Sequence, residues 1–172
     1  MNNLEKIIKE IVPYIVIVVV VILIRTLIET PVIVRGDSMY ETLHDGEVLI
    51  LSKISYKLAS IKRYDIVVVK DNDDDYIIKR VIGLPGDDIE YKDNILYING
   101  KEIEEDFQKA ETKDFNITDL GYEKIPKDCY FVIGDNRNDS SDSRIIGCIN
   151  KKNILGNANL VIYPLNDFGI KK

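Results

Sequence analysis

The sequence predicts a mainly β fold, closed or sandwich-like, with one helix at its N-terminus. An almost purely aliphatic segment runs from Ile11 to Ile24, broken only by Pro13 and Tyr14. After this segment the apolar residues occur in short runs rich in Val and Ile, separated by turn residues. The 172 residues suit one domain with an appendage, and 45% hydrophobic residues are enough for a packed core.

The aliphatic segment is expected to be a membrane anchor over residues 11–28. A membrane-spanning helix needs about 20 residues, and a span from Ile7 to Ile28 admits Lys9, Glu10 and Arg25. The two basic side chains lie near the ends, where they can reach the interface. A cleaved signal peptide is the alternative, but bulky and charged residues stand where a cleavage site needs small ones. The anchor is therefore favoured.

The rest of the chain is predicted to be mostly strand, because runs of β-branched residues alternate with turn signals. Asp93 and Asn94 predict a hairpin turn, and Asn99-Gly100 predicts a second turn. Residues 92–124 are more polar than their flanks and are expected to form a peripheral inserted lobe, with one short helical turn in Glu102–Lys109. The expected strands are Thr30–Arg35, Glu47–Leu51, Asp65–Lys70, Tyr76–Ile82, Asp88–Tyr91, Ile95–Ile98, Tyr130–Ile133 and Asn159–Tyr163.

Composition argues against nucleic-acid and metal sites. A net charge of -6 and a pI near 4.9 leave no basic stripe to bind phosphates. One histidine and two cysteines cannot form a Cys/His zinc site, and Cys129 and Cys148 could be either paired or free thiols. The acidic run Asp71–Asp75 lacks the glycine and glutamate of a calcium loop and is expected to be an exposed turn. We expect no metal and no cofactor.

Ser38 lies in the stretch GDSMYETL, at a turn that begins with glycine. A serine hydroxyl is a weak nucleophile and needs a base. His44 is the only histidine, but it lies in a polar turn where a solvated side chain is the usual outcome. It therefore stays the weaker of two candidate bases.

Lys79 is the stronger candidate base. Alternate residues of a strand share a face, so Lys79 lies in an apolar row with Ile77 and Val81, and Arg80 points to the other side. Burial disfavours the ammonium and lowers the pKa of a lysine from its ordinary ~10.4. A surface strand with Lys79 in water explains the pattern equally well, so the strand pattern alone leaves both open.

Four separated blocks of the sequence resemble the bacterial type I signal peptidases, membrane-bound serine–lysine enzymes that remove signal peptides from exported proteins. The resemblance extends from the anchor to about Gly156. It implies a signal-peptidase-like β-barrel or sandwich. It also implies a cytoplasmic tail of residues 1–10 and an extracytoplasmic catalytic domain of residues 29–172. The blocks are Gly36–Leu43, Arg63–Val68, Lys79–Asp87 and Gly134–Gly147.

The resemblance also implies roles for single residues. Ser38 would be the nucleophile, its backbone N–H would bind the oxyanion, and Lys79 would be the general base. Ser140 would orient the lysine amine. Gly36 stands where some members carry a hydroxyl that assists the oxyanion, so a second donor would have to be backbone or water. Two ion pairs would support the site: Asp142 with Arg144, and Asp135 with Arg80.

Two positions depart from the family pattern. Glu41 stands where proline is common, and Tyr64 stands where glycine is common. Glu41 is expected to point to solvent and to loosen a turn that proline would stiffen.

The resemblance implies substrates with small side chains, typically alanine, at the first and third positions before the cut. An extended peptide would add as a strand along Thr30–Arg35. Partners would be preproteins and membrane lipid, not nucleic acid. Two alternatives stay open: a soluble self-cleaving repressor relative, and an inactive membrane-anchored assembly factor. The residues expected to shape the substrate pockets are Val34, Met39, Leu43, Ile77 and Ile78.

Overall fold

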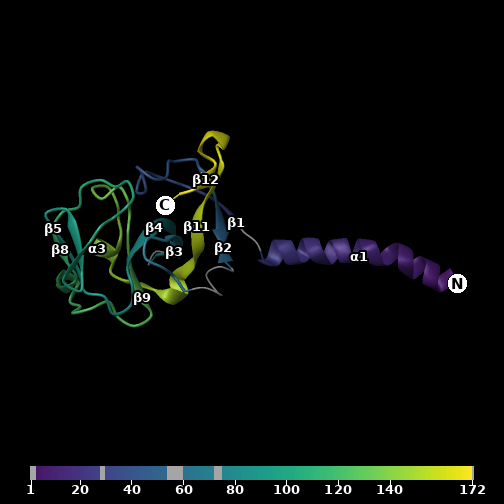
Figure 1. Ribbon diagram of the computed structural model, residues 1–172, viewed down its shortest axis with the longest axis horizontal. Helices are drawn as coiled ribbons and strands as arrows, with labels where there is room; N and C mark the ends of the chain where they lie inside the picture. Colours follow the sequence, from purple (N-terminus) through teal and green to yellow (C-terminus); the bar gives the residue numbers. More distant parts are fainter. Residues whose placement is uncertain (1–2, 28–29, 54–59, 72–74, 172) are drawn as a thin grey trace.

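The computed structural model describes residues 3–27, 30–53, 60–71 and 75–171, and within the N-terminal helix it describes the side chains of residues 9–21. Helix α1 (Asn3–Leu27) contains Pro13 and projects away from the β body (Figure 1). Across the described residues, no helix combines the length and apolar character that a membrane crossing requires. Residue 28, the expected end of the anchor, lies outside the described residues.

The larger sheet is antiparallel throughout and confirms the prediction of a mainly β fold. The sheet is open rather than closed into a barrel, because no pairing joins the two end strands, β1 and β10, among the described residues. A further strand, β12 (Gly169–Ile170), pairs with β11. The order is β1 (Thr30–Ile33), β2 (Val48–Ser52), β11 (Ile154–Tyr163), β3 (Ile66–Lys70), β4 (Tyr76–Gly83), β9 (Cys129–Ile133) and β10 (Ile149–Asn150).

The smaller sheet has the order β7 (Lys101–Ile103), β6 (Ile95–Ile98), β5 (Ile89–Lys92) and β8 (Phe115–Asn116). Asp93 and Asn94 both have positive φ, 50° and 66°, as the tight turn of a hairpin requires. The expected helical turn in Glu102–Lys109 is wrong, because residues 101–103 pair with β6 instead.

Short helical segments connect these strands. They are η1 (Ile117–Leu120), α3 (Ser143–Ile146), η2 (Lys151–Asn153) and η3 (Leu165–Asp167).

One hydrophobic cluster anchors the turn that carries Ser38. Met39 and Leu43 follow Ser38 in the sequence, and their side chains are at most 1% exposed. They pack with Leu49 of β2 and Val161 of β11. Burying two such side chains contributes about 3–6 kcal/mol before the entropic cost of ordering the turn. The position of Ser38 is therefore set by the core rather than by the surface.

The backbone conformation at Glu41 differs from the one that proline, the common residue at this position in the family, would adopt. Its φ is 91°, in a region that proline cannot reach, because the proline ring fixes φ near −65°. The expectation that proline would stiffen this turn is therefore wrong, because the turn has a conformation that proline cannot adopt. Tyr64, where glycine is common, likewise has a positive φ of 73°.

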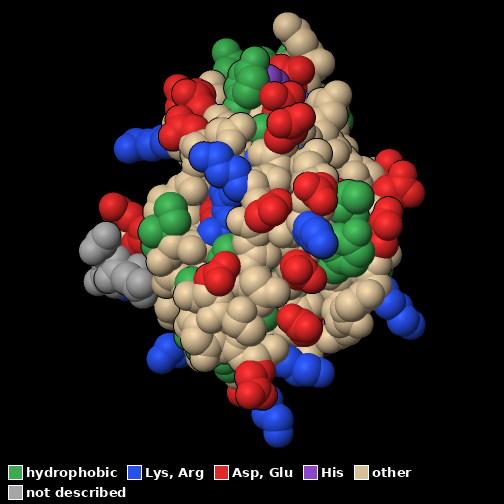
Figure 2. Space-filling model, turned by 90° about the vertical axis from the view of Figure 1, so that its left-hand side faces the viewer, with side chains coloured by type: hydrophobic (Ala, Val, Ile, Leu, Met, Phe, Trp, Pro, Cys, Tyr) green, Lys and Arg blue, Asp and Glu red, His purple; other side chains and the backbone are tan. Residues whose placement is uncertain are grey.

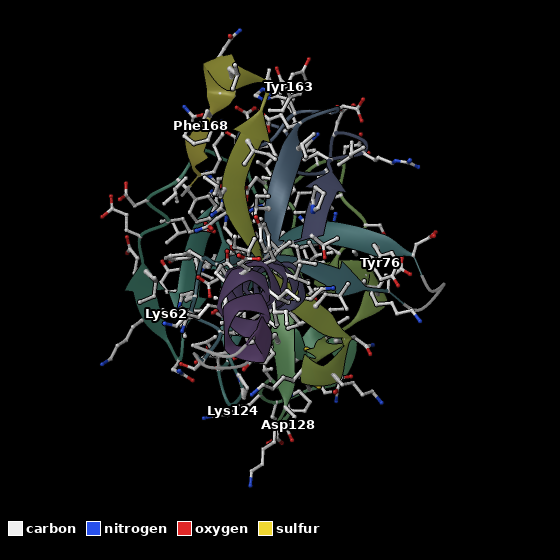
Figure 3. All side chains as sticks on the ribbon, turned by 90° about the vertical axis from the view of Figure 1, so that its right-hand side faces the viewer. Lys62, Tyr76, Lys124, Asp128, Tyr163 and Phe168 are labelled. Atoms are coloured by element: carbon white, nitrogen blue, oxygen red, sulfur yellow. The ribbon has the colours of Figure 1, made fainter. Side chains whose placement is uncertain are left out.

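The surface is acidic and carries one apolar tip. Asp and Glu side chains are scattered over the face turned away from α1 (Figure 2), in keeping with the net charge of -6. Tyr163 and Phe168 lie at the tip of the β11–β12 hairpin (Figure 3). Both are more than half exposed, as are Leu165 and Ile170 beside them.

Candidate active site

Ser38 and Lys79 come together although 41 positions separate them in the chain. Ser38 lies in the turn after β1, and Lys79 lies in the middle of β4. The distance from Lys79 Nζ to Ser38 Oγ is 2.6 Å, a short hydrogen bond. Lys79 is 2% exposed, so the structure places its side chain in the apolar interior rather than in water.

Burial lowers the pKa of Lys79 from its ordinary 10.5 to about 8. The carboxylates of Asp142 and Asp135 raise this pKa, and the guanidinium of Arg144 lowers it. With a pKa near 8, roughly a tenth of the amines are neutral at pH 7, compared with less than a thousandth for an ordinary lysine. A neutral amine 2.6 Å from the Ser38 hydroxyl can accept its proton.

The turn after β9 holds the backbone of the serine. The Asn136 N–H donates to the Ser38 carbonyl over 3.1 Å, and the Asn136 side-chain amide donates to the Asp37 carbonyl over 3.1 Å. Gly134 makes this approach feasible, since a Cβ there would lie 2.3 Å from both the Ser38 carbonyl and Ser140 Oγ. Only glycine fits at this position.

Two polar groups beside the Ser38–Lys79 pair have no partner among the described residues. Ser140 Oγ is buried and lies against Gly134, and it makes no hydrogen bond to Lys79. The Ser38 N–H likewise donates to no other described residue. A free amide at the nucleophile is available to a negatively charged oxygen, and a buried free hydroxyl can turn toward the lysine.

An ion pair behind the site joins Arg80 to Asp135. Both side chains are fully buried, and the guanidinium donates twice to the carboxylate, over 2.8 and 2.5 Å. Arg80 also donates to the Tyr64 carbonyl and to Thr42 Oγ1. Because β4 alternates, Lys79 faces the serine while its neighbour Arg80 anchors the turn after β9.

A second ion pair joins Asp142 to Arg144 over 2.8 Å. The Asp142 carboxylate also accepts a hydrogen bond from the Gly134 N–H over 3.1 Å and caps helix α3 through the Arg144 N–H. Asp142 therefore ties α3 to the turn that clamps the serine.

His44, the alternative base, lies in a different environment. Its imidazole is 3.5 Å from Glu47 Oε1, half exposed, and in an edge-to-face contact with Tyr40. No contact with Ser38 exists among the described residues. The two cysteines, Cys129 and Cys148, are free thiols, and burial raises the pKa of Cys148 to about 12. Residues 72–74 of the acidic run lie outside the described residues.

A groove of about 470 Å³ leads to Ser38 between β1 and the start of β4. Of the expected pocket residues, the structure places Val34, Met39, Ile77 and Ile78 in its lining. Leu43 does not line the groove, because its side chain packs into the core with 0% exposure. Val32, Ile33 and Arg35 also line the groove and lie in Thr30–Arg35, the segment expected to pair with the peptide. The lining residues that sequence reasoning missed are Val68, Asp75 and Tyr76.

Sequence reasoning also missed the clamp made by Asn136. One signal was available: Asn136 directly follows Asp135, which was expected to pair with Arg80, so Asn136 could have been expected near the site as well. The hydrogen bond to Ser38 spans 98 positions and leaves no local pattern.

Comparisons with known proteins agree with this geometry. The family model described as "Signal peptidase, peptidase S26" matches residues 6–163. The chain is 38% identical to a signal peptidase I of Bacillus caldolyticus, covering 92% of this chain and 93% of the relative. It is 47% identical to signal peptidase I V of Bacillus subtilis (strain 168), covering 72% and 79%.

A crystal structure of a signal peptidase I from Enterococcus faecalis V583 has the same fold in its β body. It matches with a TM-score of 0.53 and 33% identity, over 57% of this chain and 96% of that chain. Together with the family model, which covers more than half of the sequence, these relatives show that this chain belongs to the signal peptidase family, peptidase S26.

Proposed function

We propose that this protein is a serine endopeptidase that removes signal peptides from exported preproteins, with Ser38 as nucleophile and Lys79 as general base. The observation that carries the proposal is the 2.6 Å hydrogen bond between the Ser38 hydroxyl and a lysine amine that is 2% exposed. Burial keeps a share of the amine neutral, which gives the serine a base without a histidine.

The reaction has two stages. Neutral Lys79 takes the hydroxyl proton as Ser38 Oγ attacks the scissile carbonyl, and the Ser38 N–H stabilises the oxyanion. The Lys79 ammonium then protonates the leaving amine, which frees the mature protein and leaves the signal peptide esterified to Ser38. In the second stage Lys79 takes a proton from water, hydroxide attacks the ester, and Ser38 recovers its proton. Ser140 Oγ, which is buried without a partner among the described residues, is proposed to turn toward the amine and orient it during both stages.

The groove supports an extended substrate with small side chains. Strand β1 pairs only with β2 among the described strands, so its outer edge can receive a peptide as an additional strand. Val34, Met39 and Ile78 wall the end of the groove near Ser38 with apolar side chains that are 1–9% exposed. Such walls suit alanine at the first and third positions before the cut.

Helix α1 is proposed to anchor the enzyme in the membrane, with the β body outside the cytoplasm. The aliphatic side chains between Ile11 and Val21 are about half exposed, and α1 projects away from the β body in Figure 1. Lipid supplies the apolar surroundings that such a helix needs. The apolar tip formed by Tyr163, Leu165, Phe168 and Ile170 offers a second contact with lipid.

Cleavage of a preprotein by the purified full chain in detergent tests the proposal. We expect cutting after an Ala-x-Ala site, with a loss of about 100-fold when phenylalanine replaces the alanine before the cut, because the lining side chains Val34, Met39 and Ile78 are already packed at 1–9% exposure and would have to move for a ring. Ser38→Ala measures the background. Absence of cutting by the wild type, or equal cutting by Ser38→Ala, would point instead to an anchored protein without peptidase activity.

A further inference from the structure

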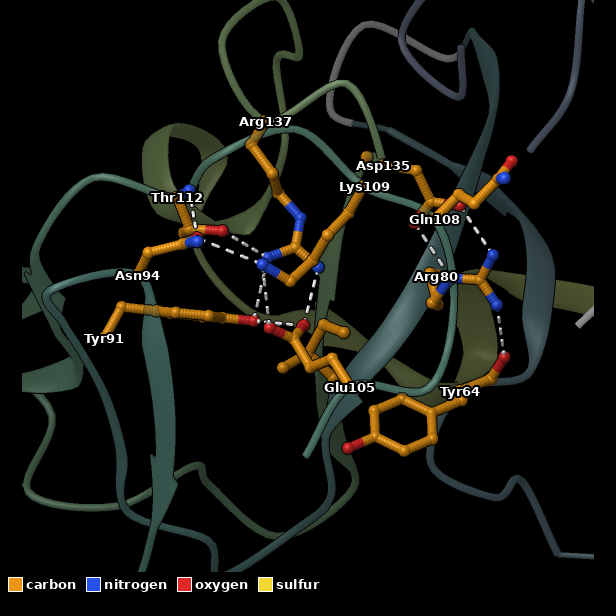
Figure 4. Close-up of polar contacts among 12 residues, drawn as sticks. Tyr64, Arg80, Tyr91, Asn94, Glu105, Gln108, Lys109, Thr112, Asp135 and Arg137 are labelled. Carbon is orange, nitrogen blue, oxygen red and sulfur yellow. Dashed lines mark hydrogen bonds and ion pairs between the residues drawn. The ribbon is translucent and has the colours of Figure 1, made fainter. Parts of the chain in front are cut away.

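The loop of residues 104–112, here called the strap, contacts the back of the catalytic site. The Ala110 N–H donates to the Asp135 carbonyl over 3.0 Å, and Thr42 Oγ1 donates to the Gln108 carbonyl over 3.4 Å. The Phe107 ring lies 4.0 Å from the Arg80 guanidinium. The strap therefore reaches the turn after β9, the turn that carries Ser38, and the ion pair between them (Figure 4).

Glu105 of the strap is paired with Arg137 in the interior. Arg137 follows Asn136 directly, and its guanidinium donates to Glu105 Oε1 over 2.6 Å. Both side chains are almost completely buried, at 0% and 3% exposure. Tyr91 Oη donates to the same carboxylate oxygen over 2.8 Å, and Lys109 Nζ lies 3.4 Å from the other oxygen. Figure 4 shows these contacts.

The remaining partners of Arg137 are neutral. Its guanidinium donates to Thr112 Oγ1 over 2.5 Å and to Tyr91 Oη over 3.1 Å, while its Nε has no partner among the described residues. A buried guanidinium that lost Glu105 would be drawn to another carboxylate. Asp135, two residues away, is close enough to affect the pKa of Arg137, and it already binds Arg80.

We propose that Glu105 is a positioning residue for hydrolysis, acting through Arg137 on the turn that clamps Ser38. Glu105, on the strap, neutralises the charge of Arg137. Asp135 then pairs with Arg80 and is not drawn toward Arg137. The turn then keeps the conformation in which Asn136 holds the Ser38 carbonyl and Gly134 admits Ser140 Oγ. Glu105 touches neither the serine nor the groove. The inference rests on the proposed peptidase function.

The experiment compares kcat and KM of the full-length wild type and Glu105→Gln on the Ala-x-Ala preprotein, at a temperature where circular dichroism shows both folded. We expect kcat to fall about 10-fold and KM to stay within about twofold, because a displacement of reacting groups by 1 Å can cost ~100-fold in rate while the groove is unchanged.

Asp87→Asn is the matched control. Asp87 is also a buried carboxylate paired with an arginine, Arg63, over 3.0 Å, and its side-chain hydrogen bonds go to Leu84 and Asn99 instead of to the turns that carry Ser38 and Asn136. We expect Asp87→Asn to melt at a lower temperature than the wild type and to keep its kcat within twofold, which separates positioning from a general loss of stability.

The double variant Glu105→Gln/Arg137→Gln also removes the guanidinium that Glu105 neutralises, so it decides the question if Glu105→Gln does not fold. We expect it to melt higher than Glu105→Gln and to recover a kcat within about twofold of the wild type, because no guanidinium is left at position 137 to draw Asp135 away from Arg80. A kcat within twofold of the wild type in folded Glu105→Gln overturns the inference. So does a double variant that stays about 10-fold slower than the wild type, or an equal loss in Asp87→Asn. A wild type that does not cut refutes the peptidase function itself.

Discussion

Replacement of Lys79 by methionine is expected to lower kcat by about 10²- to 10⁴-fold, the range that a general base contributes. Methionine fills a similar volume in the apolar site but cannot accept the proton of Ser38. The substrate groove does not include Lys79, so KM should change much less than kcat. Cleavage of the Ala-x-Ala preprotein under single-turnover conditions measures this loss.

The same replacement is expected to stabilise the protein at neutral pH. Burial lowers the pKa of Lys79 to about 8 in the folded state, against 10.5 when exposed. Between these values the unfolded chain binds more protons, so the free energy of unfolding of the wild type rises with pH. At pH 7 the wild type has not yet gained this free energy. Lys79→Met should therefore be more stable by roughly 1–3 kcal/mol, reduced by the free energy of the lost hydrogen bond to Ser38.

Urea denaturation at pH 7 and at pH 10 checks the sign of this effect. The advantage of Lys79→Met should shrink as the pH rises from 8 to 10.5. Lys124→Met is the matched control, because Lys124 is an exposed lysine far from the serine in sequence, and it should change neither cleavage nor stability by more than ~0.5 kcal/mol. A Lys79→Met variant that cuts like the wild type would remove Lys79 from the mechanism.

Breaking the Arg80–Asp135 pair is expected to have the largest effect on stability. Asp135→Asn removes the carboxylate that pairs with Arg80 in a site with 0% exposure, and breaking a buried ion pair by removing one partner costs about 3–5 kcal/mol. Arg80 would keep its hydrogen bonds to the Tyr64 carbonyl and Thr42 and its contact with the Phe107 ring, which are all neutral groups. Thermal and urea denaturation of the purified variant should show a midpoint well below that of the wild type.

The double variant Arg80→Met/Asp135→Asn separates an unpaired charge from lost packing. Since it buries no unpaired charge, it should recover part of the stability that Asp135→Asn loses. A double variant that is less stable than the sum of the single losses would show that packing around Phe107, rather than charge, makes this site stable.

Sequence patterns predicted much of the fold, because residues that are neighbours in the sequence encode the longer strands. Strand β4 is eight residues long and rich in β-branched residues, so it could be recognised as a strand, and the two-residue period of a strand placed Lys79 and Arg80 on opposite faces. Strands β8, β10 and β12 have two residues each, which is too short for alternation to appear. Strand β11 begins five residues before the predicted Asn159, because its first half, which contains Gly156 and Asn157, pairs with β3 through an irregular register.

The parts of the site that escaped prediction depend on contacts between distant segments. Leu43 looked like a pocket residue because it is close to Ser38 in sequence, but the turn directs it into the core. Glu105 lies in a polar stretch that reads as exposed, and only the folded chain brings it to Arg137, 32 positions away. Propensity and spacing do not encode such pairs, since tertiary packing decides them.

The pH dependence of kcat/KM between pH 5 and 11, measured for the wild type and His44→Ala on the Ala-x-Ala preprotein, tests the central claim most directly. This ratio reports the pKa of the base in the free enzyme. A neutral Lys79 predicts a tenfold rise per pH unit that levels off near the pKa of about 8, identical in both proteins. A plateau reached near ~6.5 that disappears in His44→Ala, or one reached only near ~10.4, would contradict it.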